Sequence, residues 1–180
     1  MTQIYLGIGS NVEREQYLRR GLDALQQLLG PLELSPVFES DCVGAIGRRF
    51  FNMVVGARTH LPLADLQAAL KSIEAACGRR ENQRRGQVTL DIDILTFGRL
   101  TGSHDGITLP RPETLRNAFV LWPLALLSPD AILPGSAQTH AGLWASWDGQ
   151  QALWPVAFEW RGQQLTSPEL VATYRPLKAR

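Results

Sequence analysis

The stretch 84–98 constrains the fold of this chain more than any other, because it joins a basic segment to an apolar one that contains two carboxylates. Its part 88–97 is rich in β-branched and aliphatic residues and ends at a glycine, which predicts a strand. Alternate residues of a strand share a face, so Asp91 and Asp93 point the same way. The other face then carries the apolar residues that we expect in the core: Leu90, Ile92 and Ile94.

Two carboxylates at this spacing repel each other and are costly to bury unless a positive charge lies between them. Mg²⁺ is one such charge, and it typically binds one or two carboxylates together with substrate phosphates. Four arginines lie just upstream, at positions 79, 80, 84 and 85, and guanidinium groups fork onto phosphate oxygens. The alternative to a metal and phosphate site is that the strand face with Asp91 and Asp93, and the arginine-rich run before it, are exposed to solvent and bind nothing.

The remaining chain predicts a short series of strands and helices. Apolar periodicity and turn residues give strands over 4–11, 32–39 and 50–58, helices over 14–29 and 62–77, and a loop over 40–49. Gly7 and Gly9 do not continue into a dinucleotide-binding fingerprint. We therefore interpret them as part of a turn and not as a phosphate loop.

Two polar residues stand out within these elements. Asn52 is the one amide in an apolar strand, and it must be satisfied either by the backbone or by a ligand. Glu74 falls in the last turn of its helix, where the macrodipole disfavours an acid, so we expect it to have a partner nearby. Alternatively, Asn52 is an amide that the core itself satisfies, and Glu74 is a glutamate that faces solvent.

Composition excludes several classes of protein. A chain of 180 residues is long enough for one domain, and its net charge of +1 provides no field for nucleic acid or an anionic membrane. Two cysteines, Cys42 and Cys77, are too few for a disulfide scaffold, and the first residues show no charged region followed by an apolar one, so we expect no signal peptide. The apolar run 118–127 is shorter than the roughly 20 residues needed to cross a bilayer. We expect a cytoplasmic protein with no membrane partner.

Several motifs occur in the order found in one enzyme family. They are Leu6-Gly7-Ile8-Gly9-Ser10-Asn11, Asn52, Ile73-Glu74, Gly78-Arg79, Thr89-Leu90-Asp91-Ile92-Asp93-Ile94, Phe97-Gly98, Leu109-Pro110 and Ala118-Phe119-Val120-Leu121-Trp122-Pro123-Leu124. From about residue 4 to residue 133 the chain resembles the 6-hydroxymethyl-7,8-dihydropterin pyrophosphokinases of folate biosynthesis.

This resemblance implies an α+β fold, a ferredoxin-like α/β sandwich with an antiparallel sheet, over residues 1–135. It implies a Mg²⁺-dependent transfer of pyrophosphate from ATP to the hydroxymethyl group of a reduced pterin, with release of AMP. Phosphoryl-type transfer depends mostly on positioning and charge neutralisation, which agrees with the carboxylates and arginines noted above.

The resemblance also implies roles for individual residues. Asp91 and Asp93 would hold two Mg²⁺ ions and, with Arg79 and Arg84, form the catalytic set. The residues expected to contact ATP are Glu74, Arg85, Ile94, Thr108, Arg111 and Arg116. Those expected to contact the pterin are Ser40, Val43, Phe50, Asn52 and Phe119.

The chain also departs from the family pattern. Val88 replaces an arginine, Arg111 replaces a histidine, and Asn117 replaces a further arginine. These changes leave open a second reading, a catalytically weakened paralogue that binds a pterin or nucleotide. A nucleic-acid-binding module is the third, but a sheet face with two carboxylates does not favour it.

Residues 136–180 extend beyond the resemblance and contain four tryptophans, at positions 144, 147, 154 and 160. The pattern over 152–165 predicts a β-hairpin. Clustered tryptophans indicate packing more often than base stacking, which also needs a basic groove. We expect the extension to pack on the same domain, in a monomer or in a weak homodimer that it mediates.

Overall fold

The computed structural model describes residues 1–42, 47–79 and 86–174. Six main elements follow in the order that the sequence predicts. They are β1 (Thr2–Ser10), α1 (Arg14–Leu29), β3 (Val37–Ser40), β4 (Phe50–Thr59), α2 (Leu63–Ala76) and β5 (Asp91–Phe97). Helix α1 has the bounds expected from its apolar periodicity, whereas β5 begins at Asp91, three residues later than expected.

An antiparallel sheet forms the centre of the molecule, with the strand order β5-β1-β4-β3-β8, in which β8 is the C-terminal strand Leu153–Val156. The expected strand 32–39 is divided into β2 (Glu33–Leu34), which also pairs with β4, and β3. The break falls at Ser35 and Pro36, and proline has no N–H for a ladder. Ser35 maintains contact with β4 there, because its Oγ accepts a hydrogen bond from the Val54 N–H at 2.8 Å.

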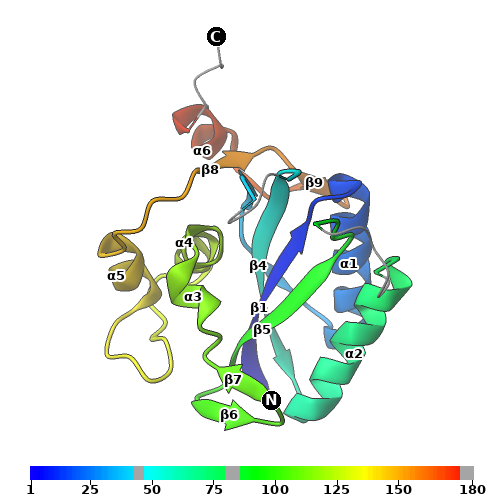
Figure 1. Cartoon of the computed structure of the whole chain (residues 1–180), viewed down its shortest axis with the longest axis vertical. Helices are drawn as coiled ribbons and strands as arrows, with labels where there is room; N and C mark the ends of the chain where they lie inside the picture. The colour runs from blue at the N-terminus through cyan, green and yellow to red at the C-terminus, as the bar shows by residue number, and fades with distance from the viewer. Residues whose placement is uncertain (43–46, 80–85, 175–180) are drawn as a thin grey trace.

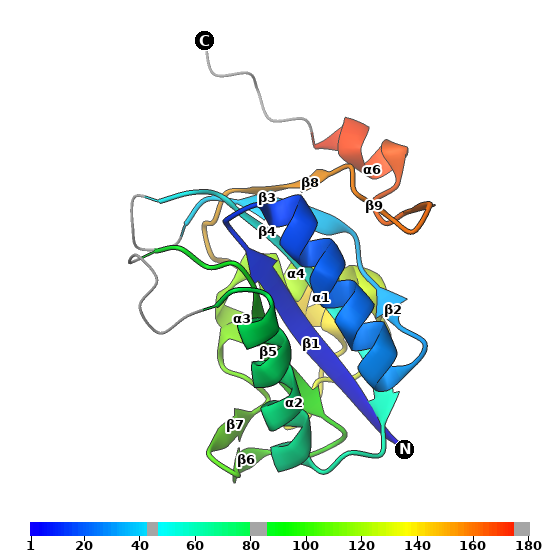
Figure 2. The ribbon, with the colours of Figure 1, turned by 90° about the vertical axis from the view of Figure 1, so that its right-hand side faces the viewer.

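Helices cover both faces of the sheet (Figure 1). Helices α1 and α2 pack side by side on one face, as Figure 2 shows, and enclose the main core. The short α3 (Glu113–Arg116), α4 (Ala118–Leu127) and α5 (His140–Ala145) lie on the other side. A smaller apolar cluster joins this second face to α4: Tyr5, Val54, Leu95 and Leu124. A separate hairpin of β6 (Gly102–His104) and β7 (Ile107–Leu109) precedes α3.

The C-terminal extension lies against this body at several points. Strand β8 (Leu153–Val156) pairs with β3 at the sheet edge, and β9 (Glu159–Trp160) pairs with β10 (Gln163–Gln164). The expected hairpin is therefore present only as the short β9–β10 pair, because the residues before it join the main sheet instead. The last element is α6 (Pro168–Thr173). Among the described residues, no helix combines the length and apolar character needed to span a bilayer.

Candidate active site between the sheet and helix α4

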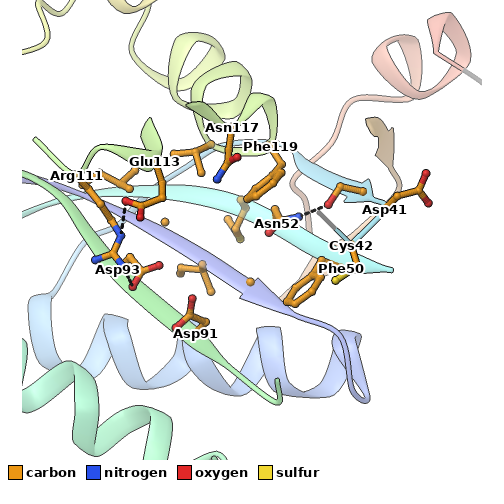
Figure 3. A pocket seen from close by; sticks show the side chains of 17 residues that line it. Asp41, Cys42, Phe50, Asn52, Asp91, Asp93, Arg111, Glu113, Asn117 and Phe119 are labelled. Carbon is orange, nitrogen blue, oxygen red and sulfur yellow. Dashed lines mark hydrogen bonds and ion pairs between the residues drawn. The ribbon is translucent and has the colours of Figure 1, made fainter. Parts of the chain in front are cut away.

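A pocket with a volume of about 380 Å³ opens between α4 and the second face of the sheet (Figure 3). Its walls come from β1, β3, β4 and β5 and from the segment that leads into α4. The volume falls in the range of roughly 300–1,000 Å³ that is usual for small-molecule sites. Polar and aromatic side chains from these separate elements converge on the pocket (Figure 3).

Two glycines form part of the pocket floor. Gly7 and Gly9 lie within β1, and Gly9 is the register partner of Asn52 on one side and of Asp91 on the other. A Cβ atom at position 9 would lie 3.0 Å from the Asn52 Oδ1. The interpretation of these glycines as a turn is therefore wrong: the strand continues to Ser10. A glycine inside a strand often marks a close approach of another group, and that is its use here.

The two carboxylates point into the pocket from one face of β5, as the alternation predicts. Ile92 and Ile94 point to the opposite face, where each is only 1% exposed in the core. Each carboxylate has an arginine beside it. Arg79 Nη1 donates a hydrogen bond to Asp91 Oδ1 at 2.5 Å, and Arg111 Nη2 lies 3.4 Å from Asp93 Oδ1.

The pair remains electrostatically unfavourable despite these arginines. Burial and the neighbouring negative charge of Asp91 raise the pKa of Asp93 to about 7, although Arg111 acts in the opposite direction. Burial disfavours the charged form of Arg79, but its contacts with Asp91 and the charge of Glu74 raise its pKa above the ordinary value. A divalent cation between Asp91 and Asp93 would relieve their repulsion, so the donor set fits such an ion.

The fit rests on these two carboxylates and on oxygens that a ligand would bring. Within the described parts of the chain, no group of three or more His, Cys, Asp and Glu side chains gathers in a way that could hold a metal. Mg²⁺ commonly binds through one or two carboxylates and completes its shell with water and substrate phosphates.

Glu74 lies behind β5 and outside the pocket lining. It is 3% exposed, so the alternative of a solvent-facing glutamate is wrong. Its Oε1 accepts a hydrogen bond from the Ile92 N–H at 2.8 Å and lies 3.5 Å from Arg79 Nη1, while Lys71 approaches its Oε2 at 3.3 Å. Glu74 therefore fixes both the carboxylate strand and the arginine that contacts Asp91.

The other end of the pocket combines an amide with aromatic rings. Asn52 is 7% exposed, and its Nδ2 donates a hydrogen bond to Ser40 Oγ at 2.8 Å. The rings of Phe50 and Phe119 come from β4 and α4 and flank this amide (Figure 3). A flat, polar heterocycle could stack on such rings while it bonds to the amide.

The structure brings many of the residues expected from the sequence into one pocket. Those that line it are Ser40, Phe50, Asn52, Asp91, Asp93, Arg111 and Phe119. Other expected residues lie elsewhere. The side chain of Ile94 is buried in the core, while Thr108 in β7 and Arg116 at the end of α3 are exposed, and none of the three lines the pocket. Val43, Arg84 and Arg85 lie outside the described residues.

Several lining residues escaped the sequence reasoning. Asp41 and Cys42 directly follow the expected contact Ser40, and Glu113 pairs with Arg111, its Oε2 lying 3.3 Å from Nε. Asn117, which stands where the family pattern has an arginine, also lines the pocket, just before α4. Their nearness in sequence to Ser40, Arg111 and Phe119 was the one available signal.

Comparison with known proteins gives a consistent result. A family model described as 7,8-dihydro-6-hydroxymethylpterin-pyrophosphokinase (HPPK) matches residues 5–129. The 2-amino-4-hydroxy-6-hydroxymethyldihydropteridine pyrophosphokinase of Pseudomonas aeruginosa is 38% identical over 136 residues, which cover 73% of this chain and 84% of that protein. The Bacillus subtilis protein of the same name is 35% identical over 125 residues, 67% of this chain and 75% of its own length.

Solved structures support the same fold. A chain described as HPPK-DHPS in complex with substrates superposes with a TM-score of 0.64 at 16% identity over 81% of this chain. The wild-type HPPK-DHPS of Plasmodium falciparum with STZ-DHP gives a TM-score of 0.63 at 15% identity over 80% of this chain. The chain spans less than half of each of these longer proteins, 44% and 43% respectively, and at such low identity the likeness concerns the fold alone.

Proposed function

The chain belongs to the 7,8-dihydro-6-hydroxymethylpterin-pyrophosphokinase family, and from this premise we propose that the pocket between α4 and the sheet is its active site. The chain is a diphosphokinase that transfers pyrophosphate from ATP to the hydroxymethyl group of 6-hydroxymethyl-7,8-dihydropterin and releases AMP. The assignment of the site rests on the different chemistry of the two ends of the pocket. One end has an amide between aromatic rings, and the other has two carboxylates with arginines beside them.

The reduced pterin occupies the end formed by Asn52, Phe50 and Phe119. The rings of Phe50 and Phe119 hold the flat heterocycle, and the Asn52 amide matches donors and acceptors on its edge. Ser40 keeps the Asn52 amide oriented through the hydrogen bond to its Nδ2. The bare floor at Gly9 leaves room for the substrate next to that amide.

The triphosphate lies toward Asp91 and Asp93, which would hold Mg²⁺. When bound there, Mg²⁺ would neutralise phosphate charge and polarise the reacting oxygens. Arg79 and Arg111 contribute guanidinium groups that can fork onto phosphate oxygens beside the carboxylates. Glu74 acts indirectly, because it holds the backbone of β5 and the Arg79 guanidinium in place.

Two further expectations belong to the same proposal. The order β5-β1-β4-β3, with α1 and α2 as crossovers, supports the ferredoxin-like description of residues 1–135. The contact of Arg111 with Asp93 supports a working role for the arginine that replaces the family's histidine. Nothing in the described residues favours the weakened paralogue.

The proposal is tested by following AMP formation from ATP in the purified protein. We expect AMP only when 6-hydroxymethyl-7,8-dihydropterin is present, and we expect EDTA to abolish it and excess Mg²⁺ to restore it. A protein that binds the pterin but forms no AMP would instead support the weakened paralogue.

A further inference from the structure

The C-terminal extension contacts both walls of the pocket within four residues. Gln151 reaches the wall formed by the start of α4, and Trp154 reaches the wall formed by the end of β3. Both residues lie beyond the region 5–129 that the family model matches. The family model therefore does not cover these contacts.

At the α4 wall, the side chain of Gln151 caps the N-terminus of α4, although it lies far from this helix in the sequence. Gln151 Oε1 accepts a hydrogen bond from the Ala118 N–H at 2.8 Å, and Gln151 Nε2 donates one to Asn117 Oδ1 at 3.1 Å. Asn117 precedes α4 but its own side chain forms no capping bond within the described residues. Since the first N–H groups of a helix need outside partners, Gln151 fixes the turn that carries Asn117 and Phe119 into the pocket.

At the β3 wall, β8 pairs with β3 and places Trp154 opposite Glu39, and an ionic network that includes the Trp154 indole adds to this pairing. Trp154 Nε1 donates a hydrogen bond to Glu39 Oε1 at 3.1 Å, and Glu39 also pairs with Arg14 at 2.7 Å and with Arg49 at 3.7 Å. Arg49 in turn binds Asp41 at 3.0 Å and lies over the Trp154 ring at 4.8 Å. Ser40 and Asp41, which line the pocket, follow directly after Glu39.

We propose that the segment 151–154 fixes the separation of the two pocket walls and that Gln151 and Trp154 are positioning residues for the pterin substrate. The proposal rests on the proposed function. Four residues can span at most about 14 Å, so neither wall can move far from the other while both contacts hold. Such preorganisation lowers the cost of ordering the site when the substrate binds.

The test compares two indole-to-phenyl changes in the same extension. Trp154→Phe removes the bond to Glu39, whereas Trp160→Phe removes an equivalent bond to Asp23 Oδ1 (3.0 Å) at a site on α1 away from the pocket. Trp160 is 6% exposed, so its replacement is at least as demanding for stability. Loss of one hydrogen bond predicts a rise of about three- to ten-fold in the pterin KM of Trp154→Phe. We expect its kcat and its ATP affinity to be nearly unchanged, and Trp160→Phe to leave the pterin KM unaltered.

A second arm does not depend on turnover. In Gln151→Met the Ala118 amide loses its acceptor, so its hydrogen exchange is expected to become faster and the pterin KM to rise. Gln151→Glu keeps the acceptor for the Ala118 N–H but loses the donor to Asn117 Oδ1, so it is expected to restore the slow Ala118 exchange and only part of the pterin KM. Equal pterin KM values in Trp154→Phe and Trp160→Phe, or unchanged Ala118 exchange in Gln151→Met, would overturn the proposal. If the wild-type protein forms no AMP, the proposed function fails, while Ala118 exchange and direct pterin binding still decide the role of the segment.

Discussion

Gly9 in β1 lies directly beside Asn52 in β4, so close that a methyl group at position 9 would sit 3.0 Å from the Asn52 Oδ1. The absence of a side chain at position 9 thus lets the Asn52 amide reach the pocket floor. Because Gly9 is also the register partner of Asp91, it lies between the amide end and the carboxylate end of the pocket.

We expect Gly9→Ala to weaken pterin binding by about ten-fold, because the added methyl group displaces the Asn52 amide. Backbone strain is not the cause, since Gly9 is not among the glycines with positive φ. The matched control is Gly7→Ala, where the new methyl would meet the flexible Leu95 side chain at 3.3 Å. Titration of pterin binding by calorimetry checks both variants, and an equal loss in the two would remove the special role of position 9.

Asn52→Ala is expected to weaken pterin binding by about 1–3 kcal/mol, since ligand donors and acceptors lose their partner. Nucleotide affinity should stay unchanged, because Asn52 lies at the opposite end of the pocket from the carboxylates. Equilibrium binding of each ligand to the folded variant gives the comparison. A variant that unfolds instead would show that Asn52 serves as a core amide.

The raised pKa of Asp93 predicts how stability depends on pH in the absence of Mg²⁺. The folded-state pKa of about 7 lies above the ordinary value of 3.8, so the folded state holds the proton more tightly between these values. The free energy of unfolding therefore falls as the pH rises from about 3.8 to about 7, where Asp93 of the folded state ionises, and levels off above that pH. Asp93→Asn removes this penalty, and its unfolding free energy should exceed that of the wild type by about 1–3 kcal/mol at pH 8 and by less at pH 5.

Urea unfolding in EDTA at the two pH values measures this difference. The exposed Asp65 on α2 provides a control, because Asp65→Asn should show no comparable change between pH 5 and pH 8. A gain for Asp93→Asn that is the same at both pH values would contradict the electrostatic explanation.

His140 predicts the opposite trend at lower pH. It is 1% exposed, its Nδ1 lies 2.8 Å from the Ser128 carbonyl oxygen, and burial lowers its pKa below the ordinary 6.5. The unfolded state then binds the proton more readily, so stability is lost as the pH falls below 6.5. His140→Phe should flatten this part of the pH profile, whereas replacement of the exposed His60 by glutamine should leave it unchanged. Thermal unfolding between pH 5 and pH 7 tests the two variants.

Local patterns in the sequence predicted part of this structure. The bounds of α1 followed from its apolar spacing, and the shared face of Asp91 and Asp93 followed from strand alternation. The role of Gly9 could not be predicted in the same way. It depends on β1 lying between β4 and β5, which is a pairing between residues far apart in the chain.

The same reason explains two other differences. Glu74 is buried because the backbone of β5 and the Arg79 side chain contact its carboxylate. The periodicity of the helix alone does not reveal these contacts. The segment 153–156 joins β3 in the sheet, although its own sequence was compatible with a hairpin. In both cases, contacts between segments far apart in the sequence determined the structure.

The role of the Asp91–Asp93 pair is tested most directly by the rate of Mg²⁺-dependent AMP formation in Asp91→Asn and Asp93→Asn. Each variant should retain its fold and lose at least about a hundred-fold in rate, because the carboxylate that would hold the cation and set its charge is gone. Glu113→Gln makes the same chemical change in another lining residue and should lose less than about ten-fold. Rates near that of the wild type in either aspartate variant would contradict the assignment of the active site to this pocket.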